Sequence, residues 1–378
     1  MPTFPDRCVA ALAAGAIGDA MGAPVEGRDP ARVAELLAGA ALDRFPPPNE
    51  FDPDGSYWKG NGRITDDTLM VEALIDGYAA AKRHLDAHDW DRFVMPNVCS
   101  RFVFVPERQR DMRIIDRLHW PEKYPYLRLR LGNVDPRSSG VGNVVNCGVA
   151  MYAWPTGALH RGDPQGAYEE ACAWAVAHNE SYAVEAAGGM AAAAAAALSG
   201  DRTDAMIAAA RDTTRDGTPR AIAAAAAAAD PALTLAEVIP RIRAAVALFD
   251  PRPAHATDTA IPGEPMPSDT GRPSRLSAIE ELPVALAALR WGDGSWAQTL
   301  DLAVRYGRDC DSIAGMAMSL FGAQHGLGAV PPALIDASQR INHRDWAVLG
   351  RRLATVADTV FAADSARWRA RAAAHAAG

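Results

Sequence analysis

Apolar residues in this chain recur in long alanine-rich runs and seldom alternate with polar ones. Residues 186–198 and 221–229 are rich in alanine, the strongest helix former, and contain almost no β-branched side chains. One short segment, residues 126–131, does alternate as a strand would, but it lies between proline-rich and glycine-rich stretches. The pattern therefore predicts an all-α protein with roughly a dozen or more helices.

The same pattern predicts where several helices begin and end. The first helix is expected at about residues 6–22, where a glycine followed by a proline provides a stop signal. The next clear helix is expected at residues 68–84. After a long irregular stretch, helical segments resume near residue 277 and continue to the end of the sequence.

We expect one domain over residues 1–378, interrupted by two irregular segments. One is an insertion rich in arginine and aromatic residues near 101–140, and the other is a proline-rich loop near 251–275. The insertion would suit phosphate binding or stacking on a base. A surface subdomain with arginines lying along apolar surface explains the same composition and is the favoured interpretation.

Two clusters of acidic and hydroxyl residues each stand directly before an apolar, helix-like run. They are residues 65–68 (Thr-Asp-Asp-Thr) and 309–312 (Asp-Cys-Asp-Ser). Either cluster alone is most simply a helix cap, because Thr and Asp satisfy free backbone N–H groups in the first turn. Each holds more acid than a cap needs, however, and oxygen ligands are those that Mg²⁺, Mn²⁺ and Ca²⁺ select. If the fold unites the clusters, their four carboxylates need cations to stay ionised.

Composition narrows the range of partners. The chain has 378 residues, of which 49% are hydrophobic and 22% charged, which is enough for a large core. A formal net charge of -8 does not indicate the basic surface with which proteins bind nucleic acids. The five cysteines form no CxxC pair, which is typical of reduced thiols in a cytoplasmic protein. Neither a signal peptide nor a membrane anchor is expected, because the first apolar segment is short and weakly hydrophobic.

With these motifs in hand, the chain resembles the ADP-ribosylglycohydrolase family, which includes ADP-ribosylarginine and ADP-ribosylserine hydrolases and the dinitrogenase reductase-activating glycohydrolase. Residues 15–26 resemble the family's first helix and the loop with its acidic residue, Glu26. Residues 65–68 match the first metal motif, and residues 309–312 resemble the second, with Ser312 where threonine is common. The resemblance implies a compact orthogonal helical bundle with a two-metal centre, usually Mg²⁺ with Mn²⁺ as a possible substitute.

The resemblance also implies roles for individual residues. The metals would hold the hydroxyls of a ribose and position water beside its C1 atom. The implied metal ligands are Thr65, Asp66, Asp67, Asp309, Asp311 and Ser312. The implied candidates for proton transfer, which the sequence does not rank, are Glu26, Asp66 and Asp311. The implied substrate-binding residues are Gly142, Asn143, Cys147, Gly148, Met151, Tyr152, His178 and Arg308.

Three departures from the family pattern concern the substrate rather than the metals. Tyr152 stands where the glycine-rich loop often has arginine, Arg308 replaces a common glycine, and His178 lacks a preceding threonine. We expect a Mg²⁺-dependent hydrolase of a ribosyl glycosidic bond that removes ADP-ribose from a protein side chain or a small conjugate. One alternative is an N-glycosidase of a nucleoside or another small glycoside. Another is an inactive protein that binds ADP-ribose or a nucleotide.

Overall fold

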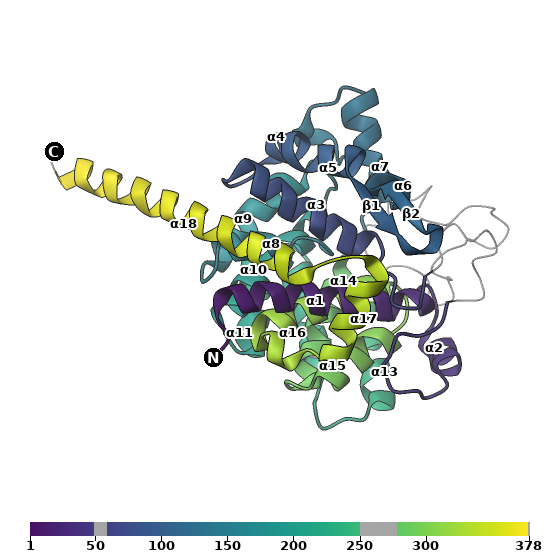
Figure 1. The fold of residues 1–378 in the computed structure, drawn as a ribbon. Coiled ribbons are helices and arrows are strands. Elements are labelled where there is room, and N and C mark those ends of the chain that lie inside the picture. Colours follow the sequence, from purple (N-terminus) through teal and green to yellow (C-terminus); the bar gives the residue numbers. More distant parts are fainter. Residues whose placement is uncertain (49–58, 250–277, 377–378) are drawn as a thin grey trace.

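A long central helix, α1 (Phe4–Gly22), runs through the middle of the protein in the computed structural model (Figure 1). The structure describes residues 1–48, 59–249 and 278–376. Thr3 starts α1 through a capping box with Asp6, and every residue of the helix from Arg7 to Gly22 is buried. Because alanine favours the helix and keeps its side chains small, neighbouring helices approach α1 closely on several sides.

Close backbone contact holds α1 against α16 (Cys310–His325). A Cβ atom on Gly18 would lie 2.3 Å from the carbonyl oxygen of Ala314, and one on Gly22 would lie 2.4 Å from that of Cys310. No other residue type leaves space for this approach. The end of α1 and the start of α16 are therefore side by side, although nearly the whole chain separates them.

The remaining helices pack around this pair and confirm the all-α prediction. In chain order they are α2 (Pro30–Leu37), α3 (Asp66–Ala81), α4 (Ala87–Asp89), α5 (Met95–Ser100), α6 (Ile114–Arg117), α7 (Trp120–Tyr126), α8 (Trp154–Leu159), α9 (Pro164–Ala175), α10 (Tyr182–Ser199), α11 (Thr203–Thr213), α12 (Thr218–Ala228), α13 (Leu235–Ala247), α14 (Ala278–Gly292), α15 (Trp296–Arg305), α17 (Pro332–Asn342) and α18 (Trp346–Ala376). Their buried apolar side chains form one contiguous core. The predicted limits of the first two helices agree with α1 and α3 to within a few residues.

The arginine-rich insertion contains the sheet that the sequence pattern did not predict. Strands β1 (Phe102–Val105) and β2 (Arg110–Arg113) form an antiparallel hairpin, with Phe102 paired to Arg113. Of the alternating residues 126–131, the first ends α7 and Leu127–Leu131 form a turn of π-helix that continues it, in agreement with the all-α prediction. Within the described residues this hairpin is the only sheet, and isolated β-bridges join Arg28 to Arg308 and Gly60 to Arg63.

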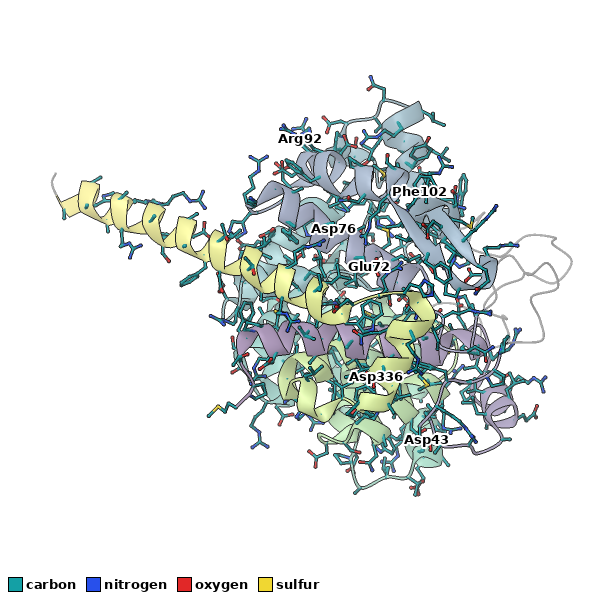
Figure 2. All side chains as sticks on the ribbon, viewed as in Figure 1. Asp43, Glu72, Asp76, Arg92, Phe102 and Asp336 are labelled. Atoms are coloured by element: carbon teal, nitrogen blue, oxygen red, sulfur yellow. The ribbon has the colours of Figure 1, made fainter. Side chains whose placement is uncertain are left out.

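Ion pairs on α3 hold the insertion and the C-terminal region in place. The carboxylate of Glu72, labelled in Figure 2, is fully buried and accepts hydrogen bonds from Arg344 at 2.6 Å and Arg101 at 3.2 Å. Asp76, one turn further along α3, pairs with Arg101 and Arg352. Beyond these contacts, α18 projects from the body of the protein (Figure 1).

Two sequence predictions stay open at the level of the fold. The segment Phe4–Val25 is long and apolar enough to cross a membrane by length and composition, yet its 18-residue apolar window is wholly buried in the fold, as in a core helix. The expectation of no membrane anchor therefore stays a prediction. The single-domain assignment also stays a prediction, and the proline-rich loop near 251–275 lies outside the described residues.

Candidate metal centre and active site

The first acidic motif begins helix α3. Thr65 is the N-cap, and its side-chain oxygen accepts a hydrogen bond from the backbone N–H of Asp67 at 3.3 Å. Asp66 and Asp67 occupy the first turn, where the helix dipole favours carboxylates. Their side chains do more than cap the helix, because both residues are more than nine-tenths buried. Capping and a role in a shared site are thus compatible here.

Asp19 of α1 fixes the start of α3 through hydrogen bonds. Its carboxylate accepts hydrogen bonds from the backbone N–H of Thr65 at 3.0 and 3.1 Å and from the Thr68 hydroxyl at 2.5 Å. Complete burial, against the effect of the Thr68 hydrogen bond and together with the charge of nearby Asp311, raises the pKa of Asp19 to about 7. The sequence pattern did not single out Asp19, which joins α1 to both acidic motifs.

The second acidic motif begins helix α16 after a tight turn. Gly307 and Arg308 both have positive φ angles, 74° and 56°. The Arg308 N–H donates to the carbonyl of Arg28 at 2.7 Å, and the Gly27 N–H donates to the carbonyl of Arg308 at 2.7 Å. This short backbone ladder fixes the loop that carries Glu26 beside the start of α16.

The two motifs and the Glu26 loop meet at a polar pocket of about 140 Å³, called here the acidic pocket. One carboxylate oxygen from each of Glu26, Asp309 and Asp311 lies within 4.8 Å of the others, and the same holds for Asp19, Asp67 and Asp311. The residues that line the pocket are Glu26, Lys59, Asp66, Asp67, His119, Pro121, Glu122, Asn146, Cys147, Gly148, Met151, Asp309, Asp311 and Ser312.

Mutual repulsion makes this group of carboxylates hard to ionise. Burial raises the pKa of Asp67 well above its usual range, and the charge of Asp311 raises it further. Burial and Asp311 also raise the pKa of Asp309 to about 7. The pKa of Asp311 itself is lowered in spite of its burial, because Lys59 donates a hydrogen bond to it at 3.0 Å and supplies a positive charge. The pocket therefore favours additional cations.

The residues present fit a hard divalent cation. Carboxylate and hydroxyl oxygens dominate the donor set, as Mg²⁺ and Mn²⁺ require. Within the described part of the chain, the Oδ1 atom of Asp67 is buried and has no hydrogen-bond partner, although it lies in the middle of this cluster. An uncompensated buried carboxylate oxygen is costly, and a bound cation would satisfy it. Lys59, which contacts Glu26 and Asp311, already supplies one positive charge.

Several predicted substrate residues lie behind the acidic pocket rather than in its lining. Tyr152 and His178 are fully buried and hydrogen-bonded to each other at 2.7 Å, and burial lowers the pKa of His178 to about 3, which keeps the imidazole neutral. Asn143 is also buried, and its amide donates to the carbonyls of Pro121 and His178 at 2.8 Å each. These residues support the pocket wall that carries Pro121.

The other predicted residues outside the lining are Gly142, Arg308 and Thr65. The Gly142 N–H donates to Glu180 at 3.0 Å in an exposed turn. Arg308 forms an ion pair with Glu280 at 3.0 Å. Thr65 is the N-cap of α3, the helix whose first turn carries Asp66 and Asp67. The metal, proton-transfer and substrate roles that the family resemblance implies stay predictions, both for the residues that line the acidic pocket and for those outside it.

The lining also contains polar residues that sequence reasoning did not select, namely Lys59, His119, Glu122 and Asn146. His119 lies with its Nε2 atom 3.7 Å from the Oδ1 atom of Asp66. Glu122 is buried, and both burial and the charge of Asp66 raise its pKa. His119 and Glu122 lie within the insertion at 101–140, Asn146 lies shortly after it, and Lys59 lies in the irregular stretch before α3. Each stands alone in sequence, so no spacing signal marked it.

Comparison with known proteins decides the family. The family model for ADP-ribosylglycohydrolase matches residues 1–369. The chain belongs to the ADP-ribosylglycohydrolase family. It is therefore a glycosidase-type hydrolase, and the family is generally metal-dependent. The resemblance drawn from the two motifs and the first helix is confirmed.

Individual relatives support the same fold. This chain is 26% identical over 343 residues to the uncharacterized protein YegU of Escherichia coli (strain K12), an alignment that covers 90% of this chain and 94% of that protein. It is also similar to the solved structure of an ADP-ribosylglycohydrolase-related protein complex, with a TM-score of 0.56 and 20% identity over 94% of this chain and 99% of the other. The helical bundle is thus the fold of the family.

Proposed function

We propose that the protein is a Mg²⁺-dependent hydrolase that cleaves the glycosidic bond of an ADP-ribosylated protein side chain or small conjugate. The observation that carries the proposal is the convergence of both acidic motifs and Glu26 in one polar pocket. Two Mg²⁺ ions bound there would grip the ribose diol and lower the pKa of a bound water, with Mn²⁺ as a substitute.

The residues of the chain supply positioning and proton transfer. Glycoside cleavage develops positive charge at C1 and at the ring oxygen, and the carboxylates of the pocket stabilise that charge. Glu26 is the best-placed base, because its side chain is 35% exposed at the pocket whereas that of Asp311 is 3% exposed. A base that water can reach takes a proton and passes it on to solvent. Asp66 and Asp311 then serve mainly to hold the Mg²⁺ ions and so to orient the ribose.

The size of the pocket limits which part of the substrate enters. A volume of about 140 Å³ is well below the roughly 300 Å³ at which pockets for drug-sized ligands begin. The described residues therefore enclose the ribose at the reacting bond, and the remainder of the substrate lies outside. The same enclosure suits a small nucleoside, so an N-glycosidase is the second candidate.

A substrate panel tests the proposal directly. ADP-ribosylarginine peptide, ADP-ribosylserine peptide and nucleosides are offered with Mg²⁺, with EDTA, and with EDTA followed by excess Mg²⁺. Release of ADP-ribose that EDTA abolishes and Mg²⁺ restores is expected for one peptide. Asp311→Asn should lose turnover, whereas Asp336→Asn on the exposed side of α17 (Figure 2) is the matched control.

Three outcomes would overturn the proposal. Turnover by Asp311→Asn at the wild-type rate in EDTA would remove the acidic pocket from the chemistry. Cleavage of nucleosides alone would favour the N-glycosidase, and tight ADP-ribose binding without turnover of any bond would mean that the pocket only binds.

A further inference from the structure

A second cluster of metal-binding residue types lies outside the acidic pocket. His84 follows α3, His160 follows α8, Glu170 lies on α9, and Asp364 comes from the C-terminal helix α18. None of them lines the acidic pocket among the described residues. Four separate elements thus contribute a histidine or a carboxylate to one place, and the family's acidic motifs account for none of them.

Two imidazole nitrogens approach a single carboxylate oxygen. The Nε2 atom of His160 lies 2.6 Å from the Oε2 atom of Glu170, and the Nδ1 atom of His84 contacts the same oxygen. The two imidazole rings lie 4.7 Å apart, centroid to centroid. One ligand atom from each of the three residues falls within 4.8 Å of the others. Two histidines and a glutamate are a frequent ligand set for zinc with one open position.

The groups around these three residues are arranged as in known metal sites. The second ring nitrogen of His84, Nε2, lies 2.8 Å from the Oδ2 atom of Asp364. A histidine that binds metal usually donates its other N–H to a carboxylate in this way. The second oxygen of Glu170, Oε1, accepts from the Tyr78 hydroxyl at 2.8 Å and from the Leu85 N–H at 2.9 Å. Glu170 therefore keeps Oε2 directed at the histidines.

The cluster is sheltered but reachable from solvent. The side chain of Glu170 is 5% exposed, that of His160 16% and that of His84 31%. A cavity of about 220 Å³ opens beside it and is lined in part by His160, Asp364 and Trp368. A metal bound by three protein ligands would have space for water or a small ligand on that side.

We propose that His84, His160 and Glu170 bind one zinc-type divalent ion, with Asp364 orienting His84. A carboxylate shared by two histidines is also a stable hydrogen-bonded network without any metal, and the separations present are hydrogen-bond distances. Ligand atoms around tetrahedral zinc lie about 3.3 Å apart, so each histidine nitrogen needs to move away from the Oε2 atom of Glu170 by less than about 1 Å on binding. The protons on His84 Nδ1 and His160 Nε2 leave as the metal–nitrogen bonds form.

The test uses the full chain freed of any histidine tag. Saturating Mg²⁺ is present throughout so that the acidic pocket does not take up the added metal. Titration calorimetry with Zn²⁺ and the visible absorption of bound Co²⁺ then measure this site alone. One equivalent should bind to the wild type, be lost in His84→Ala and His160→Ala, and persist in His88→Ala, an exposed histidine of α4.

A milder variant separates metal binding from folding. Asp364→Asn keeps the shape of the orienting residue and should weaken Zn²⁺ about 10- to 100-fold, with an unchanged circular dichroism spectrum. Zn²⁺ should also raise the Tm of the wild type but not of His160→Ala. Absence of a Zn²⁺ equivalent in the wild type would overturn the proposal and leave a hydrogen-bonded network only. Equal binding by the wild type and the His84 and His160 variants would overturn it as well.

Discussion

Replacing Gly18 with alanine tests whether close contact between α1 and α16 builds the active site. The added Cβ atom would lie 2.3 Å from the carbonyl oxygen of Ala314, whereas ordinary van der Waals contact begins at 3.4 Å. The two helices must therefore separate locally by about 1 Å. Overpacking of this kind costs roughly 1–3 kcal/mol, against which alanine returns about 1 kcal/mol of helix propensity.

Gly315→Ala is a matched control on the facing helix. A Cβ atom there would meet its nearest neighbours, Asp19 Cβ and Asp67 Oδ1, at 3.8 Å, which is ordinary contact. It gains the same helix propensity without the clash, so its free energy of unfolding should stay equal to that of the wild type or rise slightly. Urea unfolding followed by circular dichroism measures both variants on one scale.

The activities of the two variants should differ more than their stabilities. A shift of about 1 Å between the end of α1 and the start of α16 moves Asp19 and Asp311 relative to each other, and misplacement of that size can cost roughly 100-fold in rate. Gly18→Ala should therefore lose most ADP-ribose release while still folded, and Gly315→Ala should retain it. Equal stability and equal turnover in the two variants would refute the reasoning.

Two further predictions concern charge in the acidic pocket. In EDTA the free energy of unfolding should fall as the pH rises from about 4 to about 7, because Asp19 and Asp309, with pKa values raised to about 7, hold protons only in the folded state across this range. Denaturant titrations at several pH values should show a smaller fall in Mg²⁺ than in EDTA. An identical dependence of the unfolding free energy on pH in Mg²⁺ and in EDTA would contradict the prediction. Lys59→Gln should tighten Mg²⁺ binding about tenfold or more, because it removes a positive charge 3.0 Å from Asp311. Calorimetry measures the affinity for Mg²⁺, and weaker binding by this variant would mean that Lys59 stabilises the metal-bound pocket.

The helical class and the two motifs could be predicted because they depend on local chemistry. Alanine-rich runs favour helices wherever they pack, and the Asp and Thr residues at 65–68 stand where a helix start needs them. The meeting of the motifs did not follow from spacing, since it depends on the glycine contacts of α1 with α16. Only the resemblance to the family predicted that the two motifs meet.

The parts that sequence reasoning missed depend on tertiary contacts. Of the alternating residues 126–131, the last five form a π-helical turn that continues α7. The hairpin strands Phe102–Val105 and Arg110–Arg113 are too short for a clear period. Lys59 and His119 are single polar residues in irregular segments, where no period marks a face. Tyr152, to which the family loop gives a substrate role, forms a buried hydrogen bond with His178 that no sequence pattern predicts, and its substrate role stays a prediction.

The pairing of α1 with α16 also has a consequence for how the chain matures during synthesis. Helix α1 leaves the ribosome long before its partner α16, which begins only at residue 310. Until then an almost wholly apolar helix has no permanent place to pack, and contacts of such long range make folding slow and intermediates prone to aggregate. The acidic pocket therefore assembles only after the residues of α16 have been synthesised, so products truncated before them lack it entirely. Chaperone supply during expression should limit the yield of active protein more than the final stability does.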